Sequence, residues 1–293
     1  MNIAPVSLLF AALFVAGGPA AAQDTDGWAI TEASGALIAS ASYESGQSFV
    51  VRCLDGKLDV MMTGMPVETG LQFRKLEWAS EGGERQRQTW INLPDRPMVF
   101  AARPVHVARI LRKGGAVSVR LLPTAEMAQT HRYDLPLPSD GSGVEHVLTA
   151  CEVRMDDPRD DLIEIDPPIE KPGVFPDIWQ RQALPAYPNS AMSAGAGDVM
   201  FSCIVADSGR LSECRVERET PPRVGFGPAT LTSLLSARLR LGPGVEPGRL
   251  IIGPSSIDWI RDVYPSSGCG LVTTGASGSV WVGRAAVGGG PAG

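Results

Sequence analysis

The chain has 293 residues, of which 44% are hydrophobic and 20% charged, a composition that allows packed cores. Its formal net charge of −6 argues against general nucleic-acid binding, because that function needs a basic face. The length exceeds that of one typical domain and predicts two. After the N-terminal segment, no apolar run is long enough to span a bilayer.

Residues 1–22 predict a cleavable export signal. An apolar run over residues 6–16 is followed by Gly17-Gly18-Pro19 and then by three alanines, a pattern typical of secretory signals with a small-residue cleavage site. The alternative is a retained membrane anchor over residues 3–22, but the Gly-Gly-Pro break comes before the about 20 apolar residues that a span needs. We expect cleavage after Ala22 and a periplasmic protein.

Residues 23–153 predict a mostly β domain. Two apolar runs flank Leu54-Asp55-Gly56-Lys57, and Asp-Gly between such runs is a strong hairpin signal. Further short strands are predicted in "LQFRKLEW", "RQTWINL", "AVSVRLL" and "HRYDLPL". Short strands separated by turn residues favour a small sandwich or barrel, so the expected fold class is α+β with a β-rich first domain.

One helix is predicted to close this domain, in "SGVEHVLTACE". Its apolar residues fall on one helical face: Val144, Val147, Leu148 and Cys151. Ser142 and Glu145 have the spacing of a capping box. The helix turns Cys151 toward the core, and Cys53 ends the strand "FVVRC". Because an exported chain meets an oxidising compartment, we expect Cys53 and Cys151 to form a disulfide.

Residues 154–174 change character. They hold seven acidic residues, three basic residues and four prolines, which predicts an extended, solvated linker. The alternative is an acidic strip docked on a neighbouring face. The aspartate pairs at 156–157 and 160–161 lack an EF-hand loop and do not predict calcium binding. Residues 264–293 predict a flexible tail with a short strand at 279–282, in which Cys269 is either free or paired with another chain.

The stretch "FSCIVADSGRLSECRV" predicts a disulfide-bonded hairpin. If strands over residues 199–206 and 211–217 flank a two-residue turn at Ser208-Gly209, Cys203 lies directly opposite Cys214. Directly opposed residues have Cα atoms about 4.5–5.5 Å apart, which suits a disulfide. The spacing matches neither a zinc motif nor the redox motif Cys-x-x-Cys.

The region around this hairpin predicts a second unit over residues 175–263, with helices on one face of a three-stranded antiparallel sheet. Asn189 is expected to cap a short helix in "SAMSAG". Gly227 and Pro228 are expected to open a longer helix, whose core face carries Leu231, Leu234 and Leu235, and whose C-terminus lies near Arg238 and Arg240. "RLIIGPSSIDWI" supplies the third strand, although Pro254 interrupts it.

Residues 184–241 also resemble the TonB C-terminal domain family over some 60 residues. The matching positions are Tyr187, Pro188, Ala191, Gly195, Gly197, Val199, Val205, Gly209, Leu211, Val216, Phe226 and Ala229. The resemblance implies a periplasmic domain that contacts partners by adding a strand to its sheet. The first unit resembles small periplasmic β domains of the invasion- or secretion-associated kind in "VRCLDGKLDV", "VSVRL" and "HVLTAC".

The sequence favours a binding or scaffold protein over an enzyme. It contains no G-x-S-x-G, H-E-x-x-H, Walker A or G-x-G-x-x-G segment, so we expect no catalysis, cofactor or metal. His146 is expected to be packed or solvated; a deep pocket placing His106 or His131 beside carboxylates would favour an envelope enzyme. Four tryptophans are expected to be core or interface anchors: Trp78, Trp90, Trp179 and Trp259.

The expected partner is an envelope protein or peptide, bound by strand addition. Nucleic acid is not expected as a partner, and a membrane is expected only if residues 3–22 are retained. In that case the alternative function is a membrane-anchored, TonB-type energy transducer for outer-membrane transport.

Overall fold

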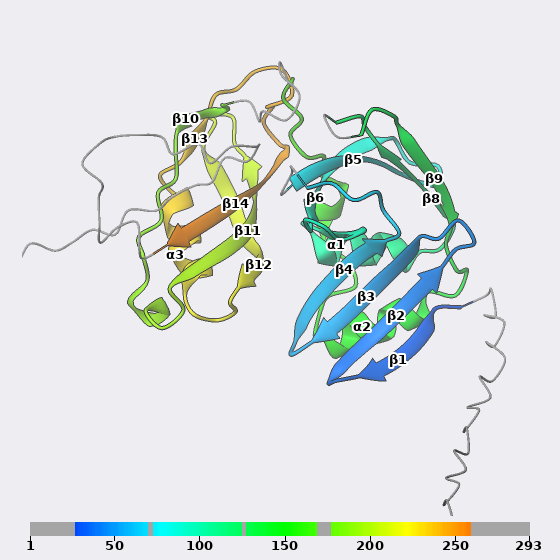
Figure 1. The fold of residues 1–293 in the computed structure, drawn as a ribbon. Coiled ribbons are helices and arrows are strands. Elements are labelled where there is room, and N and C mark those ends of the chain that lie inside the picture. Colours follow the sequence, from blue (N-terminus) through cyan, green and yellow to red (C-terminus); the bar gives the residue numbers. More distant parts are fainter. Residues whose placement is uncertain (1–26, 70–72, 125–126, 169–176, 259–293) are drawn as a thin grey trace, which may run out of the picture.

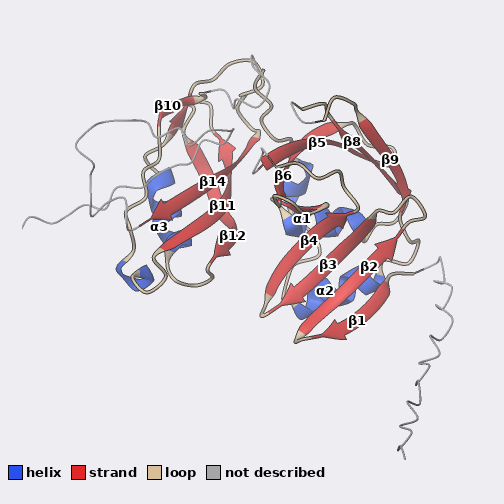
Figure 2. Cartoon of the chain, viewed as in Figure 1, coloured by secondary structure: helices blue, strands red, loops and turns tan. Residues whose placement is uncertain are grey.

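The computed structural model describes residues 27–69, 73–124, 127–168 and 177–258, which form two units rich in β-strands (Figures 1 and 2). The predicted export signal, Trp259, Cys269 and the strand predicted at residues 279–282 lie outside the described residues. The α+β class is consistent with both units, each of which combines antiparallel strands with helices.

The N-terminal unit is one nine-stranded antiparallel sheet. Its strand order is β1-β2-β3-β4-β7-β6-β5-β8-β9. The strands are β1 (Ala29–Ala33), β2 (Ala36–Ser42), β3 (Ser48–Leu54), β4 (Lys57–Thr63), β5 (Phe73–Ser80), β6 (Gln86–Asn92), β7 (Met98–Ala101), β8 (Ala116–Leu121) and β9 (His131–Pro136). The sheet curves strongly but stays open, with β1 and β9 at its edges, so it is not the closed barrel that was one alternative of the predicted sandwich or barrel (Figure 1).

The hairpin predicted around Asp55-Gly56 forms with Leu54 opposite Lys57. Both turn residues have left-handed backbones, with φ of 51° at Asp55 and 73° at Gly56. A two-residue turn with two positive φ values matches the twist of the flanking strands, which explains the preference for Asp-Gly at this position.

Helices α1 (Pro104–Leu111) and α2 (Ser142–Ala150) lie within the curve of the sheet (Figure 2). The core between them and the sheet is aromatic: the rings of Phe49 and Trp78 are 5.7 Å apart, and those of Trp78 and Trp90 are 5.8 Å apart. Trp78 and Trp90 are therefore core anchors, as predicted. Helix α1 was not predicted, although Pro104 at its start is a typical helix-opening residue.

Helix α2 forms where it was predicted, but the predicted capping box is wrong. The carboxylate of Asp140 accepts hydrogen bonds from the Ser142 amide at 2.9 Å and from the Ser142 hydroxyl at 2.8 Å. Glu145 instead pairs with Arg112 at 2.9 Å. Asp140 therefore satisfies a donor at the helix start that the capping box was expected to satisfy.

The predicted bond between Cys53 and Cys151 is present. It joins the end of β3 to the residue that follows α2, with Cα atoms 5.6 Å apart. The bond closes a sequence separation of 98 residues and fixes the helix against the sheet.

The C-terminal unit contains the predicted three-stranded antiparallel sheet, in the order β12-β11-β14, with a helix on one face. Its elements are β10 (Trp179–Arg181), η2 (Asn189–Ala191), β11 (Ala196–Val205), β12 (Leu211–Thr220), α3 (Phe226–Leu234), β13 (Arg238–Leu239) and β14 (Leu250–Asp258). Strands β10 and β13 form a separate two-stranded ladder, in which Trp179 is buried as predicted.

Five local predictions for this unit are wrong. Gly227 and Pro228 do not open the helix, because α3 begins at Phe226 after Gly225. Leu235 is 71% exposed because α3 ends at Leu234, before the predicted core face is complete. Arg238 lies in β13 instead of at the helix end. Asn189 makes no capping bond, since the residue before η2 is Pro188. Pro254 does not interrupt β14, which runs through it.

The prediction that residues 154–174 are a solvated linker is wrong for residues 154–168, where the alternative of a docked acidic strip is correct, and residues 169–174 lie outside the described residues. This segment contains the short helix η1 (Pro158–Asp161). Arg159, Glu164 and Ile165 are each at most 6% exposed. The segment packs because both units supply partners for its charges, as described next.

Candidate functional site

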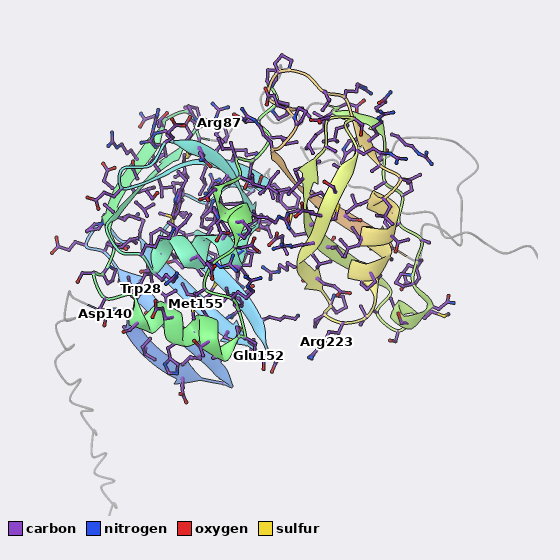
Figure 3. All side chains as sticks on the ribbon, turned by 180° about the vertical axis from the view of Figure 1, so that it is seen from behind. Trp28, Arg87, Asp140, Glu152, Met155 and Arg223 are labelled. Atoms are coloured by element: carbon purple, nitrogen blue, oxygen red, sulfur yellow. A yellow bond between two sulfur atoms is a disulfide. The ribbon has the colours of Figure 1, made fainter. Side chains whose placement is uncertain are left out.

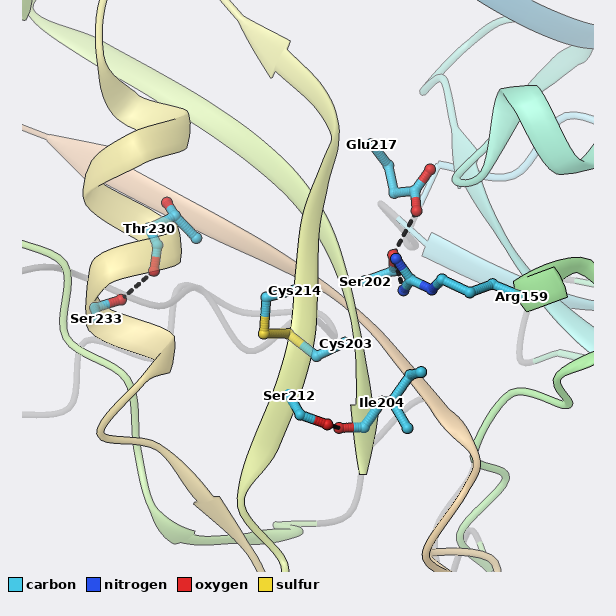
Figure 4. The surroundings of a disulfide bond; sticks show 9 residues. All are labelled: Arg159, Ser202, Cys203, Ile204, Ser212, Cys214, Glu217, Thr230 and Ser233. Atoms are coloured by element: carbon cyan, nitrogen blue, oxygen red, sulfur yellow. Dashed lines mark hydrogen bonds between the residues drawn. A yellow bond between two sulfur atoms is a disulfide. The ribbon is translucent and has the colours of Figure 1, made fainter. Parts of the chain in front are cut away.

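The two faces of the C-terminal sheet have different neighbours. Phe201 and Cys203 of β11 point toward α3 and pack in the core of the unit. Met200 and Ser202 point the other way, toward the N-terminal unit. Figure 4 shows this division, with the disulfide on the α3 side of the sheet and Ser202 on the opposite side. Both faces are therefore covered, and the edges of the sheet become the candidate binding surface.

The disulfide between Cys203 and Cys214 forms as predicted, but by a different strand register. Ala206 pairs with Arg210 around a three-residue turn, so Val205 faces Leu211 and Ile204 faces Ser212, one residue away from the predicted partners. An extra residue, Glu213, with φ of 47°, restores the register before Cys214. A β-bulge of this kind brings the two cysteines together with Cα atoms 4.1 Å apart.

The β12 edge is poorly suited to strand addition. A second register shift lies at Glu217, so this one strand carries two bulges. Its side chains alternate in sign, and Arg215 pairs with Asp157 while Arg218 pairs with Asp59 at 3.4 Å. Bulges and charged side chains are the features that prevent edge pairing in natural sheets.

The β14 edge is regular, and its open backbone groups follow from the register. The Leu250 amide donates outward to the Ile163 carbonyl at 2.9 Å, and the Leu250 carbonyl accepts from the Ile165 amide at 2.8 Å. Residues of an antiparallel strand alternate between inward and outward pairing. Because β14 pairs with β11 without a break, Ile252, Pro254, Ser256 and Asp258 also direct their backbone groups outward.

Pro254 fits this arrangement. It faces Met200 in a position where its missing N–H would point away from β11, so the ladder loses no hydrogen bond. The outward edge then offers carbonyls at four positions over residues 252–258 and amides at three. Within the described ranges, no backbone group pairs with these four residues on the outer side.

Side chains of the two units meet beside this sheet (Figure 3), and the acidic segment supplies several of the contacts. Asp157 contacts Arg215 of β12 and lies 3.9 Å from Arg109 of α1. Burial raises the pKa of Asp157. Hydrogen bonds from the Arg159 amide and the Arg215 guanidinium, together with nearby positive charge, have the larger and opposite effect, so the pKa lies below its ordinary value. The Arg159 guanidinium donates to the Ser202 hydroxyl at 2.8 Å, and Ser202 donates to Glu217.

An apolar patch completes the junction. Phe73, Ala102 and Met200 are buried together, and Ile91 and Ile252 pack against them. Arg218 lies 5.0 Å from the centre of the Phe100 ring, a cation–π distance. The two units are thus joined by apolar contacts as well as by ion pairs.

A cavity of about 240 Å³ lies between β5, β6, α1 and η1, and His106 and Asp160 line it. The His106 Nδ1 atom is 3.2 Å from Asp160, and its Nε2 atom is 3.4 Å from the Gln88 amide nitrogen. Burial lowers the pKa of His106, and Asp160 opposes this effect. Asp160 also accepts two hydrogen bonds from Arg109. Both ring nitrogens are thus engaged, so the geometry suits a structural contact better than a general base.

The other histidines do not join this cavity. His131 lies at the start of β9, and His146 is exposed on α2. Among the described residues, no group of three or more His, Cys, Asp or Glu side chains is placed to hold a metal ion.

The positions that match the TonB family pattern gather mainly in one small core. Tyr187, Ala191, Val199 and Phe226 are buried together, with Val216 and Ala229 packed against them. The Tyr187 hydroxyl donates to the Ala191 carbonyl at 2.6 Å, and its ring contacts that of Phe226. A side chain at Gly197 would overlap the Phe226 ring. These residues build the scaffold, and the edge of β14 lies beside them.

Two matched glycines have backbone roles outside that core. Gly195 follows η2 with φ of 72°, and Gly209 closes the hairpin turn with φ of 76°. Such left-handed conformations favour glycine. Pro188 precedes η2 in an extended conformation.

Comparisons with protein-family models, with curated proteins and with solved structures find no match to this chain. No helix within the described ranges has the length and apolar character that a membrane crossing requires. Two disulfides indicate an oxidising, extracytoplasmic compartment.

Proposed function

We propose that this chain is an exported periplasmic binding protein whose C-terminal unit binds an extended segment of an envelope protein along the β14 edge. The observation that carries the proposal is the regular row of outward backbone groups at residues 252–258. In strand addition, main-chain hydrogen bonds of this kind supply the affinity, and side-chain pockets supply specificity.

Three further observations support the proposal. The edge already forms one parallel bridge, between Leu250 and Glu164, through backbone groups of Ile163 and Ile165. The opposite edge, β12, is bulged and charged. The sequence also resembles the TonB C-terminal domain family, whose members bind partners partly by strand addition. The N-terminal unit then acts as a scaffold that covers one face of the sheet.

Site-specific photo-cross-linking tests the proposal. A photoreactive residue replaces Asp258 in the full chain, and the protein is exported and irradiated in intact cells. We expect an adduct with an envelope protein, and no adduct from the same group at Glu213 on the β12 edge.

Ser256→Pro removes one outward amide and leaves the β11 ladder intact, as Pro254 does naturally. Loss of one hydrogen bond of about 1 kcal/mol should lower the adduct yield about fivefold. Ser256→Ala keeps the amide and is the matched control. An adduct yield in Ser256→Pro equal to that of Ser256→Ala, or an adduct that forms equally well from residue 213, would contradict binding at β14.

The compartment has its own test. We expect the mass of the exported, non-reduced protein to correspond to a chain that begins at Gln23 and contains two disulfides. A mass that includes residues 3–22 would favour the membrane-anchored energy transducer instead.

A further inference from the structure

Residues 163–165, here called the strap, occupy the first outward position of the β14 edge. The strap forms a parallel bridge with Leu250 through two backbone hydrogen bonds, of 2.9 and 2.8 Å. It then leaves the edge, because the next amide, that of Asp166, donates to the Gly244 carbonyl at 2.8 Å. The strap therefore pairs with β14 through the same groups that an incoming strand would use, over a single residue.

The strap is also fixed to the N-terminal unit. The Glu164 side chain is 5% exposed, and one of its carboxylate oxygens accepts from three donors. These donors are the Lys75 ammonium at 3.0 Å, the Thr89 amide at 3.0 Å and the Thr89 hydroxyl at 2.9 Å. Arg87 pairs with Asp166 at 3.2 Å just beyond the strap. Glu164 therefore ties the β14 edge to β5 and β6 of the other unit.

The side chains beside Glu164 favour the docked position. Ile165 is 6% exposed and packs in the core of the C-terminal unit. Ile163, on the other side, is 37% exposed. Only two backbone hydrogen bonds hold the strap to the edge, against the four or more that a strand along residues 250–258 would form. A longer strand therefore has a competitive advantage over the strap at Leu250.

We propose that the strap is an internal competitor for the β14 edge, and that its displacement uncouples the two units. This inference rests on the proposed function. A partner that pairs only with residues 252–258 leaves the strap in place. A partner that continues to Leu250 must displace it, and it then breaks the Glu164 contacts that join the units. Binding at the edge and docking of the N-terminal unit are thereby coupled, and the coupling is reciprocal.

The test uses a strand of known sequence, a fluorescent synthetic peptide that copies residues 161–167 of the chain. In the native protein the tethered strap has a high effective concentration and excludes this peptide. Glu164→Ala removes the carboxylate that fixes the strap, whereas the peptide keeps its own Glu164 and can bind Lys75 and Thr89. Asp161→Ala removes an exposed acidic residue of the same segment and is the matched control.

We expect the peptide to bind full-length Glu164→Ala at least tenfold more tightly than it binds the native protein or Asp161→Ala, by fluorescence polarisation. Hydrogen exchange at the Leu250 amide should be at least tenfold faster in Glu164→Ala and should slow again when peptide is added. If Glu164→Ala does not fold, Lys75→Met, which removes one of the three donors, should still make exchange of the Leu250 amide faster than in the native protein and in Asp161→Ala.

Equal exchange at Leu250 in the native protein and in the folded variants would overturn the inference, as would failure of the peptide to bind folded Glu164→Ala. Neither measurement involves an envelope partner. If no cross-link forms at residue 258 but the peptide binding and the Leu250 hydrogen exchange are as expected, only the proposed function is refuted. If the cross-link forms but those two measurements fail, only the role of the strap is refuted.

Discussion

Removal of the two disulfides should destabilise the protein by different amounts. The bond between Cys53 and Cys151 spans 98 residues, and that between Cys203 and Cys214 spans 11. In the chain-entropy model these separations correspond to about 4.7 and about 2.8 kcal/mol of stabilisation at 25 °C. Cys53, Cys151 and Cys203 are buried and Cys214 is partly buried, so the packing lost on replacement by alanine differs mainly at Cys214. The difference of about 2 kcal/mol reports loop length.

The assay is urea-induced unfolding of the double variants Cys53→Ala/Cys151→Ala and Cys203→Ala/Cys214→Ala, followed by tryptophan fluorescence. Trp78 and Trp90 report on the N-terminal unit, and Trp179 reports on the C-terminal unit. We expect the first variant to lose more free energy of unfolding than the second, and to show the larger increase in slope against urea, because removal of the longer cross-link expands the unfolded chain more. A larger loss in the short-loop variant would refute the entropic reasoning and would place the stabilisation in the folded hairpin itself.

Three further outcomes are expected. Stability should fall as the pH drops below about 6.5, because burial depresses the pKa of His106 and the unfolded chain then binds the proton more readily; His106→Gln should flatten this part of a pH series of urea midpoints. The depressed pKa values of Asp157 and Asp160 add a second loss below about pH 4, since their contribution is present only above the unfolded pKa. Gly197→Ala should cost about 1–3 kcal/mol by forcing the Phe226 ring to move, measured by thermal unfolding, and an unchanged midpoint would contradict the close contact.

Local patterns predicted the elements whose shape depends on near neighbours. Asp55-Gly56 predicted its hairpin because two positive φ values are required within two residues. Both cysteine pairs were predictable. Cys203 and Cys214 lie on the two strands of one hairpin, whereas Cys53 lies at the end of a strand and Cys151 at the end of an amphipathic helix. The register of the second hairpin was not predictable, because a three-residue turn and the bulge at Glu213 compensate each other. Nothing in the spacing of Cys203 and Cys214 distinguishes that combination from a plain two-residue turn.

The junction could not be predicted from composition. An acidic segment with prolines is normally solvated, and Arg159 and Glu164 are buried only because Ser202, Lys75 and Thr89 arrive from strands remote in the sequence. One signal was present: residues 162–166, "LIEID", include an isoleucine on each side of Glu164, a period-2 pattern typical of a strand. It was outweighed by the charges and prolines around it.

The buried position of Glu164 gives the strap a property that a flexible linker lacks. A carboxylate that is 5% exposed loses most of its hydration, and its three donors restore the lost interactions only while both units hold their places. Partial displacement of the strap would leave a desolvated charge without its donors, which is costlier than either the docked or the fully released state. The strap should therefore detach as a unit, and the two arrangements of the junction should be discrete. A linker that only spans the distance between two units would need no such buried charge.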